Sequence, residues 1–369
     1  MASEVRVTEM ARSVARRPLP PVPPATEDKA TLVLFYQYIE PPWDAKAHKA
    51  ALKAVLALAA EHSICGRGRC APEGLNCSLT GAPHAVRAFC SGLRAWNPVF
   101  EETDFKLTDG IEANLAFRAL TIRKTAELVG YGLPATVAPK LATSRAEHVE
   151  ADTYHELMKE KDTVIIDVRN HYEAAIGHFA PPEDGAEFID PKLRNSHEFP
   201  KWLNAPETKA KLNNKKVMMY CTGGIRCERA SALLDSIERA EEGAEGAEGE
   251  EGGGFKTNGV VMVRGGIERY LRTFPEGGFW RGKNYLFDRR FEQSPEDKPS
   301  AALEAEVDSH CCACGRPWDR YRGQFKCGGR LPEPHGACAV PVLVCDACIR
   351  AELHGRPRAE LRCPLCAEG

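Results

Sequence analysis

Three short apolar runs, separated by segments with helical spacing, constrain the fold of this chain most strongly. The runs are DTVIIDVR, KVMMYC and GVVMVRGGI, and they end near Asp167, Cys221 and Gly265–Gly266. Apolar runs bounded by turn residues are typical of buried strands, and helices between them favour a parallel α/β sheet. Because sites in such sheets lie at the carboxyl ends of the strands, we expect these three ends to meet at one site.

The stretch YCTGGIRCERAS places Cys221 between the second of these strands and a helix predicted over 228–239. Glycines in the connecting loop permit a sharp turn, so that its amides point inward and form an anion-binding nest at the helix N-terminus. A cysteine in such a nest has a lowered pKa, and Arg226 adds positive charge. The pattern therefore predicts a reactive thiolate at Cys221, within a loop made of Thr222, Gly223, Gly224 and Ile225.

The rest of the chain divides into segments of different composition, and 369 residues leave room for two or three domains. Residues 31–140 predict an α+β domain with the order β-α-β-β-α-β, which is ferredoxin-like. Residues 146–285 form the predicted parallel-sheet domain. We expect a disordered leader over 1–30, which contains PLPPVPP, and a disordered acidic insertion over 238–254, which is rich in glutamate and glycine.

Residues 309–369 are dense in cysteine and contain three C-x-x-C pairs. Two thiolates of such a pair reach one tetrahedral ion, so the segment predicts a structural zinc module; a disulfide module is the alternative. The spacing leaves open how the ligands pair around two ions. The candidate ligands are Cys311, Cys314, Cys327, Cys338, Cys345, Cys348, Cys363 and Cys366.

The chain has no apolar run long enough to span a membrane and no secretory signal. Together with its fifteen cysteines, this predicts a reducing, cytoplasmic location without membrane association. An arginine-containing N-terminal segment leaves organellar targeting open. No G-x-G-x-x-G follows a predicted strand, so we expect neither a flavin nor a nicotinamide cofactor.

The segments IIDVRNHYEAAIGHF, MYCTGGIRCERAS and VRGGIERY together resemble the rhodanese domain. With GRCAPEGLNCSLTG, GKNYLFDRR and the cysteine-rich tail, the chain resembles the rhodanese-domain tRNA uridine hydroxylase family. Eukaryotic relatives of that family are named thiosulfate sulfurtransferase/rhodanese-like domain-containing proteins. The resemblance implies a rhodanese-like domain flanked by an acylphosphatase-like domain and a zinc module. It further implies oxygen-dependent 5-hydroxylation of the wobble uridine of tRNA, with Cys221 as the active-site thiol and Arg226 closing its loop.

Two other functions remain open at this point. The chain could be a sulfurtransferase in which Cys221 carries a persulfide from thiosulfate or a related donor. It could also be a non-enzymatic RNA or protein adaptor built on the zinc module. The six-residue span from Cys221 to Arg226 resembles rhodaneses and is one residue shorter than in related phosphatases. Cys227 is a candidate resolving thiol, the alternative being an ordinary residue of the next helix.

Cations beside aromatic residues indicate where tRNA could bind. Basic side chains flank Tyr285 and Phe287, a composition that suits phosphate contact and base stacking; a solvated linker with buried aromatics is the alternative. A second candidate patch contains Arg118, Arg123 and Lys124. The residues of the first patch are Arg281, Lys283, Arg289 and Arg290.

Overall fold

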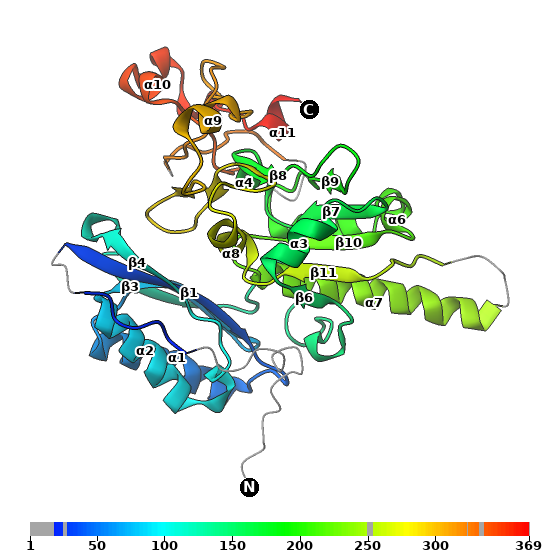
Figure 1. Cartoon of the computed structure of the whole chain (residues 1–369), viewed down its shortest axis with the longest axis horizontal. Helices are drawn as coiled ribbons and strands as arrows, with labels where there is room; N and C mark the ends of the chain where they lie inside the picture. The colour runs from blue at the N-terminus through cyan, green and yellow to red at the C-terminus, as the bar shows by residue number, and fades with distance from the viewer. Residues whose placement is uncertain (1–17, 25–27, 249–253, 323, 332–335, 369) are drawn as a thin grey trace, which may run out of the picture. The chain divides into compact units, whose positions relative to one another are not determined.

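A computed structural model describes residues 18–24, 28–248, 254–322, 324–331 and 336–368 (Figure 1). The chain forms two compact units. Unit 1 comprises Met1–Ser144 together with Phe287–Arg289, and unit 2 comprises Arg145–Leu286 together with Arg290–Gly369. The cysteine-rich segment therefore belongs to the same unit as the parallel sheet.

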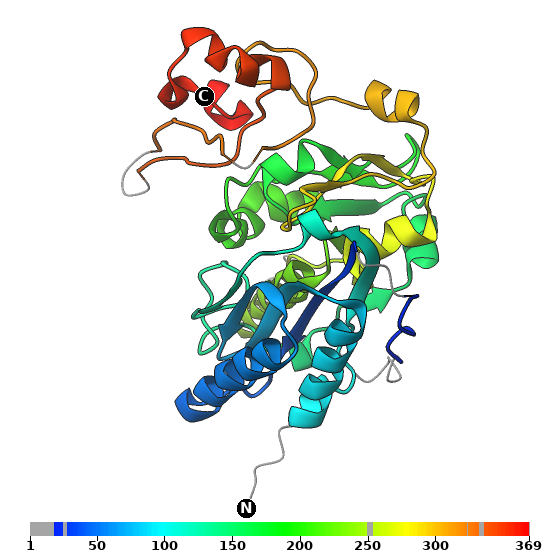
Figure 2. The same cartoon turned by 90° about the vertical axis from the view of Figure 1, so that its left-hand side faces the viewer.

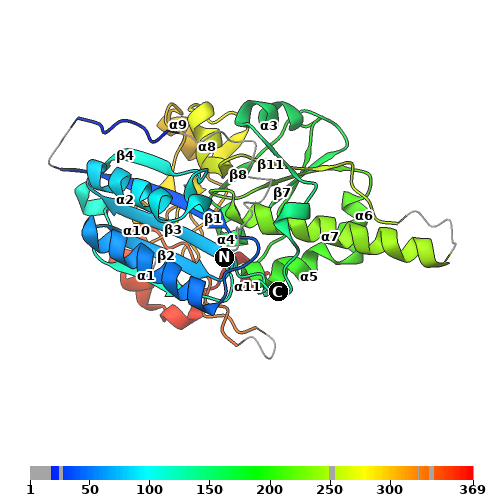
Figure 3. The same ribbon diagram turned by 90° about the horizontal axis from the view of Figure 1, so that it is seen from below.

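Unit 1 is an α+β fold with the predicted β-α-β-β-α-β order and one additional strand. Its sheet has the strand order β4-β1-β3-β2-β5, in which β5 runs parallel to β2 and the other pairs are antiparallel. Both long helices lie on one face of this sheet (Figure 3). The elements are β1 (Lys29–Tyr38), α1 (Ala45–Glu61), β2 (Cys65–Ala71), β3 (Gly74–Gly81), α2 (Pro83–Trp96), β4 (Lys106–Glu112) and β5 (Leu120–Lys124), with short 3₁₀ turns at Pro98–Phe100, Ala113–Leu115 and Leu141–Thr143.

Helix α1 of unit 1 begins at Ala45, directly after the capping residue Asp44. The Asp44 carboxylate caps its first turn by accepting a hydrogen bond from the amide of Ala47 at 2.7 Å. Its apolar positions recur every three to four residues, so they line one side of the helix and reach the sheet. Alternate residues of the strands, among them Phe35 and Cys77, complete the core between the sheet and both helices. Figure 2 shows the two helices, in blue and cyan, next to each other on the sheet.

Unit 2 contains a five-stranded sheet in which every neighbouring pair is parallel, as the sequence predicted. The strand order is β6-β11-β10-β7-β9. One face of the sheet packs against α3 and α8 through an aromatic core that includes Tyr154 and Tyr270. The elements are β6 (Glu147–Val149), α3 (Ala151–Leu157), β7 (Thr163–Asp167), α4 (His171–Ala174), β9 (Glu187–Ile189), α5 (Phe199–Leu203), α6 (Pro206–Leu212), β10 (Lys216–Tyr220), α7 (Ile225–Glu248), β11 (Val260–Val263) and α8 (Gly266–Thr273).

The remainder of unit 2 is built from short elements. Strand β8 (Gly177–Phe179) pairs with β12 (Trp280–Gly282), and β13 (Asn284–Tyr285) pairs with β14 (Glu292–Gln293). The cysteine-rich segment is built from isolated bridges and short helical turns, and its buried apolar side chains cluster with its cysteines. Its elements are α10 (Asp346–Arg350), α11 (Pro364–Ala367) and 3₁₀ turns at Glu352–Gly355 and Arg358–Glu360. Helix α9 (Ser300–Ala305) precedes it, and a further 3₁₀ turn of the unit lies at Ser196–Glu198.

The expectation of a disordered insertion over 238–254 is wrong for its first part, because α7 continues to Glu248. Glu238 is buried and accepts a hydrogen bond from the amide of Thr257 at 2.7 Å. Glu241 accepts from the amide of Phe255 at 3.2 Å and from Lys209 Nζ at 2.6 Å. Alanine and glutamate are strong helix formers, so an acidic composition here extends a helix. Residues 249–253 lie outside the described residues.

The predicted leader over 1–30 overlaps the fold at its end. Strand β1 already begins at Lys29, and the carbonyl oxygen of Pro20 accepts a hydrogen bond from Arg87 Nε at 2.8 Å. Residues 1–17 and 25–27 lie outside the described residues, so the expectation for them remains a prediction. Among the helices that the structure describes, none is long and apolar enough to cross a membrane.

Candidate active site and cysteine clusters

Cys221 is the first residue after β10, at the carboxyl end of the central part of the parallel sheet. The chain turns through Gly224, whose φ of 102° lies in the region that favours glycine. This turn aims the amide of Gly224 at the Cys221 sulfur, at 3.1 Å. Helix α7 starts at the next residue, Ile225, so the thiol lies at the N-terminus of a long helix.

The turn after β11 holds the other side of the thiol loop. Amides at the start of α8 donate to the loop carbonyls, from Ile267 to Cys221 at 3.0 Å and from Glu268 to Thr222 at 3.2 Å. A Cβ on Gly266 would lie 2.6 Å from the carbonyl oxygens of both Cys221 and Thr222 and 2.8 Å from Gly223 Cα, so only glycine permits this approach. Two of the three predicted strand ends therefore do meet at one site.

Cys221 and Cys227 are both buried, and they form a thiol pair in which only one member ionises readily. Burial alone would raise the pKa of Cys221. The hydrogen bond from Cys227, the charge of Arg226 and the backbone amides of both residues outweigh burial and lower this pKa to about 5. Burial, and then the hydrogen bond to Cys221, raise the pKa of Cys227 well above its usual value. Cys221 is therefore a thiolate at neutral pH that accepts a hydrogen bond from a neutral Cys227.

Arg226, which the sequence assigns to the end of the loop, is held in place by the carboxylate of Glu173. Its guanidinium forms two hydrogen bonds with the Glu173 carboxylate, at 2.6 and 2.8 Å, and a third with Thr222 Oγ1 at 3.3 Å. Glu173 is fully buried in α4, where it also accepts from the amide of Asn170 at 3.1 Å. This bidentate pair fixes the cation beside the thiolate.

Asp167, the third strand end, forms part of the framework of the sheet. Its carboxylate accepts hydrogen bonds from Arg169 Nη2 at 2.6 Å and from Tyr220 Oη at 2.8 Å, and all three side chains are fully buried. Arg169 also donates to the carbonyl oxygen of Gly177 at 2.7 Å. A carboxylate with this many buried partners orients strands β7 and β10 and is not available to substrate.

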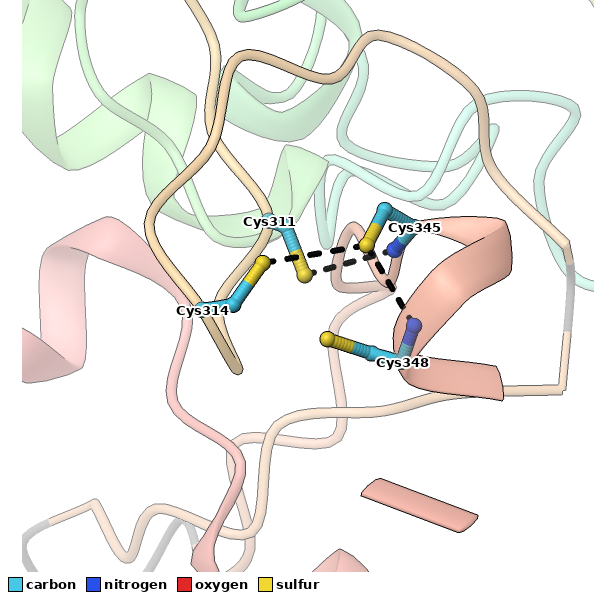
Figure 4. A group of neighbouring side chains, drawn as sticks. All are labelled: Cys311, Cys314, Cys345 and Cys348. Atoms are coloured by element: carbon cyan, nitrogen blue, oxygen red, sulfur yellow. Dashed lines mark hydrogen bonds between the residues drawn. The ribbon is translucent and has the colours of Figure 1, made fainter. Parts of the chain in front are cut away.

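The eight cysteines predicted as metal ligands gather into two separate groups of four. In each group all four sulfur atoms lie within 4.8 Å of one another. Figure 4 shows the four side chains of the first group converging from a loop and from α10. All fifteen cysteines of the chain lie in the described ranges and are free thiols, so no disulfide forms the module. The groups are Cys311, Cys314, Cys345 and Cys348, and Cys327, Cys338, Cys363 and Cys366.

The sulfur geometry fits a tetrahedral metal ion. Zinc–sulfur bonds of about 2.3 Å place the sulfurs of a tetrahedron about 3.8 Å apart. Cys314 and Cys345 have their sulfurs 3.7 Å apart, and Cys338 and Cys363 have theirs 3.8 Å apart. Backbone amides also donate to the sulfurs, as from the amide of Cys345 to Cys311 Sγ at 3.3 Å. The ligands of the two groups alternate along the chain, an order that the spacing left open. Each ion would therefore join two segments that are separated in sequence by ligands of the other ion.

Three tyrosines connect the cysteine-rich segment to the thiol loop. The rings of Tyr172, Tyr285 and Tyr321 pack edge to face, with centroids 5.3 to 6.0 Å apart. Tyr321 comes from the cysteine-rich segment, and its hydroxyl donates to the carbonyl oxygen of Tyr172 at 2.8 Å. Tyr172 directly precedes Glu173, the partner of Arg226. Sequence reasoning missed this connection, because its members lie far apart in the chain.

The four cations predicted to contact RNA do not form one exposed group. Lys283 is buried and pairs with Asp319 at 2.8 Å, and Arg281 pairs with Asp308 at 3.1 Å. Arg289 belongs to unit 1, where it donates to the carbonyl oxygen of Ala116 at 2.8 Å, whereas Arg290 belongs to unit 2. An RNA-binding role for these four residues remains a prediction.

Three family models match successive parts of this chain. The model described as "UPF0176 acylphosphatase like domain" matches residues 30–128. The model described as "Rhodanese-like domain" matches residues 150–273, which contain Cys221 and Arg226. The model described as "Rhodanase C-terminal" matches residues 281–367, which contain both cysteine groups.

Curated relatives match the chain across these segments. A tRNA uridine(34) hydroxylase from Synechococcus is 33% identical and covers 79% of this chain and 80% of its own length. One from Enterococcus faecalis is 34% identical and covers 71% of this chain and 72% of its own length. Rhodanese-like domain-containing protein 6 from Arabidopsis thaliana is 32% identical over 77% of this chain, which spans only 45% of that protein. The chain therefore belongs to the tRNA uridine(34) hydroxylase family of rhodanese-domain enzymes.

Proposed function

We propose that this protein hydroxylates C5 of the wobble uridine of tRNA with molecular oxygen, and that Cys221 is its catalytic thiol. Membership of the family supports the substrate and the reaction. The observation that carries the role of Cys221 is its lowered pKa in a loop of inward-pointing amides. A cytoplasmic location remains the prediction that accompanies this proposal.

A thiolate at Cys221 accounts for activation of the uridine. Addition of its sulfur to C6 moves the ring electrons onto the C5 side, which makes C5 nucleophilic towards oxygen. Insertion of one oxygen atom into the C5–H bond takes two electrons from the uridine. The second oxygen atom leaves as water with two electrons and two protons from a dithiol co-reductant, which is oxidised to a disulfide. Elimination of the sulfur from C6, with loss of a proton from C5 to solvent, then returns Cys221 as a thiolate and restores the C5–C6 double bond.

Access to Cys221 requires a conformational step, because its side chain is fully buried. Enzymes that act on a base take it out of its stack into a pocket. Here the wobble uridine has to reach the sulfur past segments that contact the loop, such as β13, where the Tyr285 carbonyl accepts from Thr222 Oγ1 at 3.5 Å. Binding of tRNA therefore includes movement of part of this cover.

We infer that each cysteine group holds a structural zinc ion. The four-sulfur ligand sets and the edges of 3.7 and 3.8 Å support a closed tetrahedral site, which leaves no position for substrate. Bound zinc would supply folding energy to a segment with few regular elements. Through the tyrosine contacts, a folded cysteine-rich segment would also hold α4 in position, and with it the Glu173–Arg226 pair.

Nucleoside mass spectrometry of tRNA tests the proposal in cells that lack the endogenous protein. We expect the unaltered protein to restore 5-hydroxyuridine at the wobble position and Cys221→Ser to fail, because a serine hydroxyl is not ionised at neutral pH. Cys65→Ser, at a half-buried cysteine of unit 1, is the matched control and keeps the product. Restoration by Cys221→Ser at comparable protein level contradicts the role of this thiol.

Sulfur transfer is the second candidate function, because the same observation favours it. A thiolate surrounded by amides and a cation also suits attack on a sulfur donor, with Cys221 then carrying a persulfide. Both reactions require Cys221, so its substitution does not separate them. The two reactions differ in the atom that is added to the uridine, which is oxygen in one and sulfur in the other.

A further inference from the structure

We propose that the sheet face of unit 1 opposite its helices binds the RNA strand of the tRNA substrate. The proposal rests on the proposed function for its choice of tRNA, and it assigns a surface that the thiol loop does not include. We call this surface the sheet face; it is the outward row formed by Tyr36, Asn76, Arg69 and Arg123, with the neighbouring Arg67.

Strand register places this row on one face. Tyr36 on β1 lies opposite Asn76 on β3, Asn76 lies opposite Arg69 on β2, and Arg69 lies opposite Arg123 on β5. Four adjacent strands thus present one aromatic, one amide and two guanidinium groups side by side. With strands about 4.8 Å apart, the row is about 15 Å long.

The adjacent row proves which way these side chains point. Phe35 on β1, Cys77 on β3 and Ile122 on β5 lie one residue away in the same register, with Gly68 between them on β2. Phe35 and Cys77 belong to the core under α1 and α2, and Ile122 packs against it. Because successive residues of a strand point to opposite faces, the row with Tyr36 faces away from both helices.

The sheet face has the charge that RNA requires. Strands β2, β3 and β5 contain four cations and no acidic residue. These cations are exposed, and within the described residues no carboxylate pairs with any of them. An acidic protein could also bind this positive charge, but the row in addition carries aromatic and guanidinium groups that stack with nucleic-acid bases. Arg67, Arg69 and Arg123 lie on the sheet face, whereas Lys124 follows Arg123 and points to the opposite face.

Aromatic rings accompany the cations on both sides of the row. The Arg67 guanidinium lies 5.2 Å from the centroid of the Phe117 ring, and Lys106 Nζ lies 5.2 Å from that of Tyr36. Single-stranded RNA is commonly bound on sheets where aromatic and guanidinium planes stack with unpaired bases and cations contact phosphates. An anticodon loop offers such unpaired bases beside a continuous phosphate backbone.

Two triple variants with equal charge change test the sheet face. The first is Arg67→Glu with Arg69→Glu and Arg123→Glu. The second, as matched control, reverses three exposed lysines of α1 on the opposite face of the same unit, Lys46, Lys49 and Lys53, also to glutamate. Binding of unmodified tRNA is measured by fluorescence anisotropy at several salt concentrations, and alkylation of Cys221 confirms that the thiol site is intact.

We expect the sheet-face variant to bind tRNA at least about tenfold more weakly. The plot of log binding constant against log salt concentration should become less steep. Its slope should change by about one for each phosphate that the side chains no longer neutralise. The control should change affinity by about twofold or less, since its charges lie on the other face. Unchanged affinity of the sheet-face variant overturns the proposal, and so does equal weakening by both variants, which would indicate net charge alone.

Measurement of the product separates failure of this surface from failure of the proposed function. If the sheet-face variant binds and hydroxylates tRNA like the unaltered protein, the hydroxylase proposal stands and the surface is wrong. If tRNA binding depends on the sheet face but the unaltered protein leaves the wobble uridine unhydroxylated in cells, the surface stands and the hydroxylase proposal is wrong.

Discussion

A hydrogen bond from Cys227 and the charge of Arg226 lower the pKa of Cys221, although burial alone would raise it. The Cys221 sulfur would otherwise be a protonated thiol, as the buried Cys77 is, whose pKa burial raises. This difference between two buried cysteines of one chain shows that local donors decide reactivity.

Removing the donor at residue 227 should therefore raise the pKa of Cys221. We expect Cys227→Ala to move the midpoint of Cys221 alkylation upwards from about 5, whereas Cys227→Ser keeps an O–H donor and a midpoint nearer to that of the unaltered protein. In the unaltered protein the alkylation rate should be constant above neutral pH and fall as pH drops through the midpoint. Peptide mass spectrometry of the Cys221 peptide over a pH series measures this. An equal midpoint in both variants would rule out the hydrogen bond as the cause.

Among the secondary-structure elements, α7 shows that helix-forming residues and tertiary contacts order a segment whose acidic charge predicted disorder. Its acidic continuation is anchored by Glu238, which is buried, accepts from the amide of Thr257 and pairs with Arg145 at 3.3 Å. Glu242 is more exposed and pairs with the same arginine at 3.5 Å. Loss of a buried acceptor leaves an amide unsatisfied, whereas loss of an exposed ion pair costs little.

Glu238→Ala should accordingly lower the free energy of unfolding by about 1–3 kcal/mol. Glu242→Ala, four residues further along the same helix, should change it by about 0.5 kcal/mol or less. Urea denaturation followed by circular dichroism measures both. Equal stability of the two variants would mean that the residues around Glu238 do not hold the end of the helix.

The cysteine-rich segment should behave as a metal-dependent element with two ions. We expect Cys345→Ser to lower the bound zinc from two equivalents towards one, while Cys312→Ser, which removes a cysteine outside both groups, keeps two. A strong chelator should expose 311–366 to protease and leave the parallel sheet folded, because apparent zinc affinity of about 10–16 kcal/mol then no longer supports the segment. Elemental analysis combined with limited proteolysis tests this, and a protease-resistant segment without metal would refute it.

For the whole molecule, the sequence predicted features that depend on local patterns. Apolar runs and helical spacing predicted the parallel sheet of unit 2 and the element order of unit 1. The loop glycines and Cys221 predicted the position of the thiol. Contacts between distant residues were not predictable in this way: Glu173 meets Arg226 across 53 positions and Tyr321 meets Tyr172 across 149. Spacing also could not pair the cysteines, because alternating and sequential arrangements contain the same C-x-x-C pairs.

The identity of the atom added to the wobble uridine tests the central claim most directly. Adding an oxygen and replacing an oxygen by sulfur give the same nominal mass, so the product has to be labelled. Cells that depend on this protein for the modification are grown under isotopically heavy molecular oxygen, and their tRNA nucleosides are analysed by mass spectrometry. We predict that the modified uridine carries one heavy oxygen atom and disappears when oxygen is withheld. A product that contains sulfur, or that forms unlabelled and equally well without oxygen, would contradict hydroxylation.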